Sequence, residues 1–439
     1  MSDSWRHGAL FDGLPYGAGL DFKAENKVRT SDRGCKNAFA AAVLASFIAV
    51  GSPVWAADIS GGVVKIGVIN DATGPLSDSN GQGSVVAAKM AIDDFRKQNP
   101  NIKVELLYAD HQNKPDIGVA VVRRWIDVDG VDVIADVGNS AVGLALQTVI
   151  RDKNKIAIYT SVASTELTGK QCVKTGFAWL HDSYTLVAGP LRSLVAQGLD
   201  TWFFVAADYA FGKNMVAESQ RVLARVGGKS LGAVYHPMDT ADYSSFLLQA
   251  QGSGAKVVAF SSVGSQLVNS MKQWKEFGMD AGGQRPLAQL LFLTDVHSMG
   301  LDVAGGLTSV VGWYWGLNDE TRAFGHRFFE LHRKMPTAPQ AAVYSGLSHY
   351  LKGVAATGSD DTDAVARWMR ENSVDDFFAR GAKIREDGKL IHDFYLFQVK
   401  NKSDLKEPWD YYDIVRRIPA DEAFSPLSES ECPLVKASH

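Results

Sequence analysis

Short apolar runs, rich in β-branched residues, alternate along the chain with stretches that have the hydrophobic period of a helix. Runs such as IGVI, VVAF and LLFL are apolar throughout, which is typical of strands covered by helices on both faces. Alternation at this spacing predicts βαβ units and an α/β fold with parallel sheets. The predicted strands are Val63–Ile69, Val104–Ala109, Val131–Asp136, Ile156–Thr160, Trp202–Ala206, Ala233–His236, Lys256–Phe260, Leu290–Leu293, Ser309–Tyr314 and Phe394–Val399. The predicted helices are Gly83–Lys97, Asp116–Val128, Val142–Asp152, Leu186–Gln197, Lys213–Val226, Tyr243–Gln251 and Ser265–Phe277.

Polar loops that contain Gly, Pro, Ser or Asp follow most of the predicted strands. Loops at the carboxyl ends of parallel strands are where open α/β sheets bind ligands. The pattern therefore predicts a ligand crevice lined by these loops, which span residues 71–81, 136–141, 160–165, 206–212, 261–264 and 294–298.

A different apolar segment lies near the N-terminus, where Lys36 precedes the unbroken run Ala38–Val50. A basic flank, a short apolar region and small residues before the cleavage point predict a secretory signal peptide, cut after Ala56 or one residue later. The sequence before Lys36 is Gly-rich and polar, which indicates a start codon assigned too far upstream, with the true start near Val28. We exclude residues 1–57 from the fold; a buried helix after a disordered tail is the alternative.

Composition describes an ordinary globular chain, 46% hydrophobic and 21% charged. Without residues 1–57 it has 39 basic and 44 acidic residues, a net charge of −5. No basic surplus is present to neutralise phosphates, which argues against a nucleic-acid partner. After residue 57 no apolar run approaches the roughly 18 to 20 residues of a membrane span. A chain of about 380 residues exceeds the size at which one core keeps growing, so two domains are expected.

Two cysteines remain after the predicted leader, Cys172 and Cys432. In an oxidising compartment such a pair is expected to form a disulfide. The bond would close a loop of roughly 260 residues and stabilise the fold by at most about 5 kcal/mol. Two buried thiols are the alternative.

Motifs for catalysis or phosphate binding fail on inspection. Gly228–Ser230 resembles the end of a phosphate-binding loop, but Leu223 occupies the position of the required glycine. Gly138–Val142 nearly spells a nucleophile elbow, yet its last position is Val142, so Ser140 is interpreted as a hydrogen-bond donor. His326, Glu330 and His332 lack the spacing of a metal site and read as a solvated helix face. We therefore expect no metal and no cofactor, and binding rather than catalysis.

Three segments carry a family resemblance: Val64–Leu76, Glu105–Pro115 and Asp242–Leu247. In these segments, and in order along residues 62–400, the chain resembles the periplasmic solute-binding proteins of the leucine/isoleucine/valine branch of ABC import. The resemblance implies two Rossmann-like lobes, the type I periplasmic binding protein fold, joined by three crossovers with the ligand in the cleft between them. The implied lobes are residues 58–181 with 315–388, and residues 182–314 with 389–439, a tail included that extends beyond the usual end of the family.

The resemblance also implies a ligand site. In the first lobe, hydroxyl groups and backbone N–H groups of two loops fix a ligand carboxylate in the family, and helix N-termini suit an anion. The matching residues are Asn139, Ser140, Ser161 and Ala163, of which Asn139 and Ala163 depart from the hydroxyl residues of the amino-acid binders. Ser164 or its neighbour Thr165 would supply the missing donor. Loop caps without ligand contact are the alternative.

In the second lobe, Asp295 lies where the family carries the acid that pairs with a ligand ammonium group, with a helix cap as the alternative. Tyr209 and Phe211 lie in the loop that supplies an aromatic wall. Further large side chains lie near the implied crossovers, where packing of the core or hinge is the more common role: Trp179, His181, Trp313 and Trp315.

The implied function is that of a periplasmic substrate-binding protein. Its lobes would close over a small carboxylate-bearing solute and present it to a permease whose ATPase subunits hydrolyse ATP. A branched-chain or related amino acid is the first expectation for the solute, and an aromatic or other small organic acid is the second. A ligand-sensing receptor module and a secreted hydrolase that uses Ser140 are the alternatives from other classes.

Overall fold

The computed structural model describes residues 58–436. The predicted signal peptide and the upstream extension lie outside these residues, so both remain predictions. Within residues 58–436, no helix combines the length and the apolar composition needed to cross a membrane.

Most strands and helices lie at the predicted positions, with boundaries that differ by a few residues. The strands are β1 (Val64–Asn70), β2 (Val104–Asp110), β3 (Val133–Asp136), β4 (Ile156–Tyr159), β5 (Gly176–Ala178), β6 (Thr201–Ala207), β7 (Lys229–His236), β8 (Val257–Ser261), β9 (Arg285–Ala288), β10 (Thr308–Val311), β11 (Lys383–Ile384), β12 (Leu390–Ile391), β13 (Phe394–Val399) and β14 (Tyr412–Ile418). The helices are α1 (Gly81–Gln98), α2 (Pro115–Arg124), α3 (Ser140–Lys153), α4 (Ser183–Ala196), α5 (Ala210–Val226), α6 (Ser244–Gly252), α7 (Ser265–Glu276), α8 (Leu293–Met299), α9 (Leu301–Ala304), α10 (Asp319–His332), α11 (Ala338–Thr357), α12 (Thr362–Glu371), α13 (Ala420–Ala423) and α14 (Pro433–Lys436).

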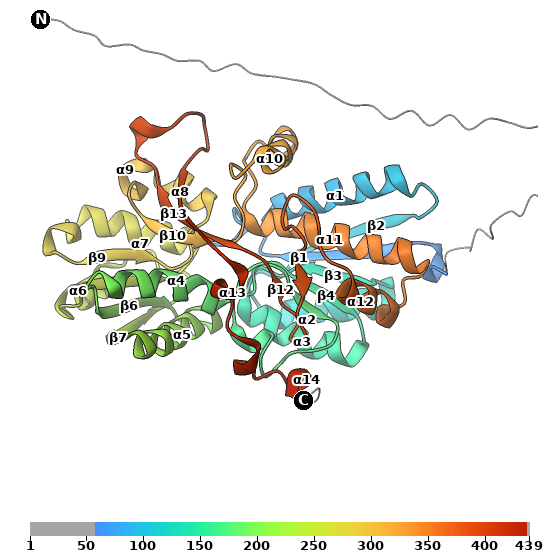
Figure 1. Ribbon diagram of the computed structural model, residues 1–439, viewed down its shortest axis with the longest axis horizontal. Helices are drawn as coiled ribbons and strands as arrows, with labels where there is room; N and C mark the ends of the chain where they lie inside the picture. Colours follow the sequence, from blue (N-terminus) through green and yellow to red (C-terminus); the bar gives the residue numbers. More distant parts are fainter. Residues whose placement is uncertain (1–57, 437–439) are drawn as a thin grey trace, which may run out of the picture. The chain divides into compact units, whose positions relative to one another are not determined.

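The first sheet is parallel, with the strand order β2-β1-β3-β4-β5. Helices α1 and α11 cover one face and α2 and α3 cover the other (Figure 1). Alternate residues of each strand serve the two faces: Val68 packs in the cluster with α1 and α11, whereas Ile69 and Ile134 pack with α2 and α3. Burial on both faces explains why these strands are apolar throughout.

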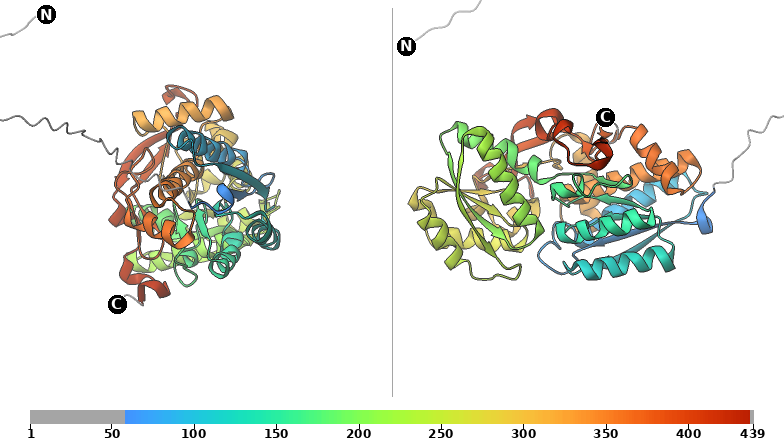
Figure 2. Two further views of the ribbon diagram at one scale, coloured as in Figure 1. Left: turned by 90° about the vertical axis from the view of Figure 1, so that its right-hand side faces the viewer. Right: turned by 90° about the horizontal axis from the view of Figure 1, so that it is seen from below.

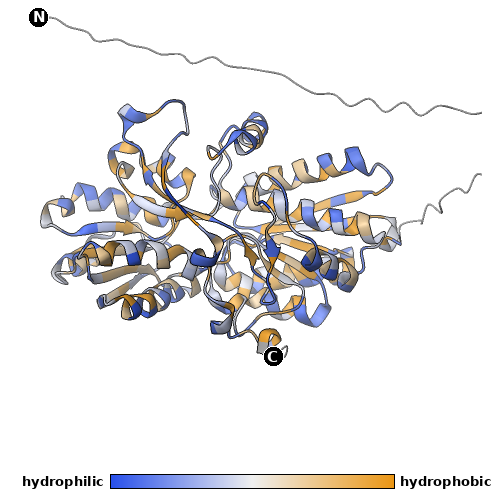
Figure 3. Cartoon of the chain, viewed as in Figure 1, coloured by the Kyte–Doolittle hydropathy of each residue, from blue (hydrophilic) through white to orange (hydrophobic). Residues whose placement is uncertain are grey.

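The second sheet is also parallel, with the order β7-β6-β8-β9. Phe203 and Val205 of β6 pack with residues of α6 and α7, whereas Trp202 and Phe204 pack with residues of α4 and α5. In Figure 3 the strands are coloured mainly as hydrophobic, and hydrophilic segments lie on the surrounding helices and loops. The two parallel sheets confirm the predicted α/β fold.

The predicted strand Leu290–Leu293 is wrong. The edge strand of the second sheet is β9, five residues earlier, and Leu293 is the first residue of α8. Pro286 within β9 is tolerated because an edge strand needs fewer backbone donors. Residues 290–293 are apolar because they are a buried loop between two core clusters, and a short apolar run does not distinguish a buried strand from a buried loop.

A third, antiparallel sheet was not predicted, although two of its strands were. It has the order β10-β13-β14, and β14 lies in the tail beyond the region of family resemblance. Helices α10, α11 and α12 were not predicted either. Of these, α11 packs along α1, which covers the first sheet. The chain passes from the elements around the first sheet to those around the second between β5 and α4. It returns between β10 and α10, and crosses again between β12 and β13. The exact boundaries of the two lobes remain a prediction.

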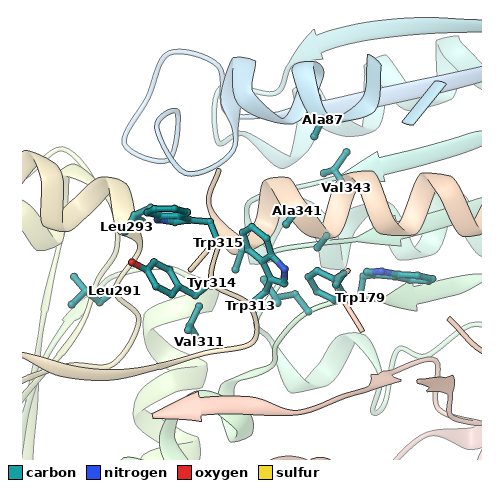
Figure 4. Packing of buried hydrophobic residues seen from close by; sticks show 14 of the residues in the cluster. Ala87, Trp179, Leu291, Leu293, Val311, Trp313, Tyr314, Trp315, Ala341 and Val343 are labelled. Atoms are coloured by element: carbon teal, nitrogen blue, oxygen red, sulfur yellow. The ribbon is translucent and has the colours of Figure 1, made fainter. Parts of the chain in front are cut away.

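One hydrophobic cluster runs through the segment Trp313–Trp315 that follows β10. It contains Leu291 and Leu293 on the side of α8, and Ala341 and Val343 of α11. Figure 4 shows the three aromatic side chains between these two groups of residues. The core is therefore continuous between helices of the first sheet and the loop that precedes α8.

The C-terminal tail contacts elements of both parallel sheets. Glu429 pairs with Arg221 and Arg225 of α5, at 3.1 and 2.9 Å. Three residues later, Cys432 forms a disulfide with Cys172, in the segment between β4 and β5. Figure 2 shows this dark red segment beside the green helices. The tail therefore bridges α5 and the first sheet.

Candidate ligand-binding site

Asn139 and Ser140, predicted to bind a carboxylate, lie at the N-terminus of α3. Asn139 is its N-cap, because the side-chain oxygen accepts hydrogen bonds from the backbone N–H groups of Ala141 and Val142, at 2.8 and 3.1 Å. The Asn139 amide nitrogen donates to the side-chain oxygen of Asn113, at 3.0 Å. These contacts fit the loop-cap alternative for Asn139.

Ser140 is different, because its buried hydroxyl has no hydrogen-bond partner among the described residues. It is the first residue of α3, whose leading N–H groups and dipole favour an anion. An unpaired buried hydroxyl at a helix N-terminus is a suitable donor for a carboxylate.

The loop after β4 carries Ser161, Ala163 and Ser164, and all three residues are buried. The carbonyl oxygen of Ala163 accepts a hydrogen bond from the backbone N–H of Ser183, at 2.6 Å. The Ser164 hydroxyl oxygen accepts from the N–H of Glu166, at 3.3 Å, and so caps a short 3-10 helix. The hydrogen of that hydroxyl remains available for donation.

Asp136 is a buried group that the sequence analysis did not single out. It ends β3, has no exposed surface, and accepts hydrogen bonds from three side chains, the amides of Asn70 and Asn80 and the hydroxyl of Thr160, at 2.7, 2.7 and 2.6 Å. Burial raises the pKa of its carboxyl group, and these donors counter the rise. The available signal was an acid at the end of a fully apolar strand.

The loop after β1 reaches the second sheet. Asp71 shapes this loop by accepting hydrogen bonds from the N–H groups of Gly74 and Leu76, both at 2.8 Å. The carbonyl oxygen of Pro75 accepts a hydrogen bond from the N–H of Ser265, the first residue of α7, at 3.3 Å. Loops at the carboxyl ends of β1 and β8 are therefore in direct contact.

Apolar residues from loops of both sheets meet at the same place. Leu76 and Ala163 of the first sheet belong to one buried cluster with Phe211 and Phe292. Tyr209 packs against this cluster, and its ring centroid lies 5.9 Å from that of Phe211. The structure thus brings together three of the predicted site residues, Ala163, Tyr209 and Phe211.

The prediction that Asp295 directly follows a strand is wrong, because Asp295 lies in the first turn of α8. Its carboxylate accepts a hydrogen bond from the backbone N–H of Phe292, at 2.9 Å, which is the capping role of the alternative. The side chain is buried, and burial, with a smaller contribution from the charge of Asp78, raises its pKa to about 7. A carboxylate this poorly compensated would be stabilised by a cationic group.

The aromatic residues near the crossovers serve mainly in packing. The indole N–H of Trp179 donates to the Ser345 hydroxyl, and that of Trp315 to the carbonyl oxygen of Trp409, both at 3.1 Å. Trp313 packs edge-on against Phe324. These side chains belong to the core cluster of Figure 4.

His181 shares one feature with Trp313, whose indole nitrogen is also buried without a partner among the described residues. Its Nε2 atom is buried without a partner among the described residues, and its ring lies 6.4 Å from that of Phe292. Burial lowers the pKa of His181 to about 4, so the imidazole is neutral at pH 7. A neutral imidazole with a free nitrogen can exchange a hydrogen bond with a ligand.

A recess of about 440 Å³ opens where the loops of the two sheets approach. Its walls include Asp71, Thr73 and Asn113 on one side, and Met238 and Asp239 on the other. We interpret it as the mouth of the region where these loops meet.

Metal chemistry has no candidate centre in the part of the chain that the structure describes. No group of three or more His, Cys, Asp or Glu side chains there could hold an ion. His326 packs edge-on against Trp315, and His332 against Phe328, on α10. These histidines therefore pack against aromatic rings.

Similarity to known proteins agrees with this geometry. The chain is similar to a crystal structure of a periplasmic binding protein from Burkholderia mallei, with 41% identity, a TM-score of 0.83, and coverage of 85% of this chain and 99% of the other. A second crystal structure, a branched chain amino acid ABC transporter periplasmic ligand-binding protein from Burkholderia xenovorans LB400, has 39% identity, a TM-score of 0.76, and coverage of 85% and 100%.

A curated relative, Leu/Ile/Val-binding protein homolog 6 of Brucella melitensis, is 24% identical over 320 residues, which cover 69% of this chain and 79% of the relative. The sequence model of the periplasmic binding protein family matches residues 63–404. The predicted type I fold is thereby confirmed, and the chain belongs to the periplasmic binding protein family.

Proposed function

We propose that the protein is the substrate-binding component of an ABC importer, which captures a small carboxylate-bearing solute and delivers it to a permease. The observation that carries this proposal is the meeting of loops from the carboxyl ends of two separate sheets at Leu76, Ala163 and Phe211. Ligands of open α/β sheets bind at such ends, and a ligand held from both sides stabilises the closed form. The partner subunits supply ATP hydrolysis.

The proposal includes the two predicted lobes, residues 58–181 with 315–388 and residues 182–314 with 389–439. Export through the predicted signal peptide places the mature chain in the periplasm. There it binds its solute without converting it, and it uses no cofactor.

A branched-chain or related amino acid is the first candidate for the solute, as the names of two relatives suggest. The unpaired Ser140 hydroxyl and the N-terminus of α3 suit the ligand carboxylate. Asp295, with its pKa raised to about 7 by burial, suits the ammonium group, which would restore its ionised form.

An aromatic acid is the second candidate. The rings of Tyr209, Phe211, Phe292 and His181 lie in or against the region where the loops meet. Aromatic rings stack on one another with energies that favour such a ligand over an aliphatic one of equal size. Of the other classes, a hydrolase would need a base for Ser140, and a receptor would need a signalling partner.

Isothermal titration with L-leucine, L-valine, benzoate and 4-hydroxybenzoate tests the proposal and separates the two candidates. For an amino-acid ligand, Asp295→Asn is expected to weaken binding about a hundredfold, because the ammonium loses a buried counter-charge. For a benzoate, the same variant is expected to bind within about twofold of the wild type. The matched control is Asp242→Asn, an exposed acid before α6. Unchanged leucine affinity in Asp295→Asn would remove Asp295 from the site.

A further inference from the structure

The carboxylate of Asp136 connects three loops at the carboxyl edge of the first sheet. Asn70 and Asn80 lie at the two ends of the β1–α1 loop, Thr160 follows β4, and Asp136 itself begins the loop from β3 to α3. Their side chains donate to the two Asp136 oxygens at 2.7, 2.7 and 2.6 Å. Hydrogen bonds to a charged acceptor in a dry environment are strong, so the three loops are held to one point.

Two of the three donors, Asn70 and Asn80, are themselves held by further elements. The Asn70 amide nitrogen also donates to the Gly81 carbonyl oxygen at 3.0 Å, and its oxygen accepts from the Tyr108 hydroxyl of β2 at 3.1 Å. The carbonyl oxygen of Asn80 accepts from the Gln340 amide of α11, at 3.1 Å. Asp136 and its three donors, which we call the node, are therefore also connected to β2, α1 and α11.

The backbone at the node is unusual. Asp136 and Val137 both have positive φ, 79° and 56°, which costs energy in non-glycine residues and persists only where neighbours fix the conformation. The next residue, Gly138, has no room for a side chain, because a Cβ atom there would lie 2.9 Å from the Asn80 side chain. This chain path sets the position of Ser140, two residues later.

Both Asp136 oxygens are fully buried and engaged in hydrogen bonds. One accepts from Asn80 and Thr160, and the other accepts from Asn70. No ion pair involves Asp136 within residues 58–436, so hydrogen bonds alone stabilise its charge. A change at this carboxylate must therefore act on the ligand through the loops.

We propose that Asp136 is the positioning residue of the ligand site, fixing the loop that carries Ser140 relative to the loop that carries Ser161. The inference rests on the proposed function, because it assigns a role in that site to a residue that does not touch the solute. The same role predicts ordered loops around Asp136 in the ligand-free protein, which can be measured without any ligand.

Asp136→Asn tests the proposal with the smallest change in shape. It replaces one acceptor oxygen by an NH2 group that faces a donor, so at least one of the three loops is released. The control is Asp132→Asn, at the opposite end of the same strand. Asp132 is also buried and accepts from the N–H of Lys65 at 2.8 Å, but it lies away from the loops.

Binding is measured by titration with the probe among L-leucine, L-valine, benzoate and 4-hydroxybenzoate that the wild type binds most tightly, at a temperature where all variants are folded. Asp136→Asn is expected to bind about ten- to a hundredfold more weakly, and Asp132→Asn within about twofold of the wild type, although both melt at lower temperature. Thr160→Val should give an intermediate loss that Thr160→Ser restores. Equal affinities in the Asp136 and Asp132 variants would overturn the proposal.

Hydrogen exchange of the ligand-free protein gives a second readout. We expect faster exchange in peptides that cover residues 78–82, 137–142 and 160–165 in Asp136→Asn, and wild-type exchange there in Asp132→Asn. If the wild type binds none of the four probes, the proposed solute class fails while this measurement still decides the role of Asp136. Unchanged exchange in the three loops would exclude that role.

Discussion

Asp136 and Asp295 are both buried carboxylates at the carboxyl edges of parallel sheets, yet their surroundings differ. Asp136 accepts hydrogen bonds from three side chains, two at the ends of the β1–α1 loop and one in the loop after β4. Asp295 accepts only from backbone N–H groups, those of Phe292 and Gly264, and the charge of Asp78 raises its pKa further. Neither forms an ion pair within the described part of the chain.

The difference separates two uses of a buried charge. A fully buried carboxylate that accepts from several loops fixes those loops and is enclosed by them. A carboxylate that accepts only from two backbone N–H groups fixes fewer side chains, and its raised pKa shows that its charge would be stabilised by a cation. Under the proposed function, the first sheet would provide a fixed edge and the second sheet the group that pairs with the ligand.

Truncation of each carboxylate gives the largest expected effect. Asp136→Ala leaves three buried donors without partners and is expected to lower the free energy of unfolding by about 3–5 kcal/mol. Asp295→Ala leaves two backbone N–H groups without this acceptor and should cost less, about 1–2 kcal/mol. Urea denaturation at pH 7 measures both values. Similar losses would mean that the two groups do not differ in structural role.

The pH dependence of stability gives the next effect. The pKa of folded Asp295, about 7, exceeds the ordinary value of about 4 in an unfolded chain. Between these values the folded state holds a proton that the unfolded state has released, so the free energy of unfolding falls as pH rises from about 4 to 7. Asp295→Asn lacks this titrating group. Its free energy of unfolding should therefore increase relative to that of the wild type, by on the order of a few kcal/mol, as pH rises over that range.

Urea denaturation of both proteins at several pH values between 4 and 7 measures this divergence. Comparison with Asp295→Asn cancels the contributions of the other titrating groups. Parallel curves for the two proteins would show that the carboxyl group of Asp295 titrates normally.

The smallest expected effect on stability concerns the contact between the loop after β1 and the loop after β8. Gly264 has φ of 58°, and a Cβ atom there would collide with the carbonyl oxygen of Pro75 from the first sheet. Gly278 has nearly the same φ, 63°, with open space around it. An alanine at either position should cost about 1–2 kcal/mol of backbone strain. Only Gly264→Ala should also prevent the decrease in radius of gyration that a bound probe produces.

Small-angle scattering with and without a saturating probe measures that decrease. Gly278→Ala is the control for strain alone. Full compaction of Gly264→Ala would show that the Pro75 contact is not required when the edges approach.

Much of the fold could be predicted because parallel strands buried on both faces contain unbroken apolar runs, as Ile66–Ile69 in β1 and Val257–Phe260 in β8. The failures occur where burial does not follow a regular element, as in the loop at Leu290–Phe292, or where an edge strand is largely exposed, as in β14. The helices α10–α12 were not predicted, although α12 is strongly amphipathic. Their period was present in the sequence.

The candidate site was predictable only in part. Ala163, Tyr209 and Phe211 were placed in one region by the family resemblance, and the structure brings them together. The role of Asp136 could not be found, because its partners are distant in sequence, at positions 70, 80 and 160. Hydrogen bonds between such distant side chains leave no periodic signal.

The C-terminal tail has a mechanical consequence. Between Glu429, paired with α5, and Cys432, bonded to Cys172, the chain is three residues long and spans at most about 11 Å when extended. Separation of α5 from Cys172 beyond this reach must detach Glu429 from both arginines, whose exposed ion pairs contribute at most about 1 kcal/mol each. The tail therefore limits how far α5 can move from Cys172 while the Glu429 ion pairs are kept. Beyond that distance the ion pairs break, whereas the disulfide remains.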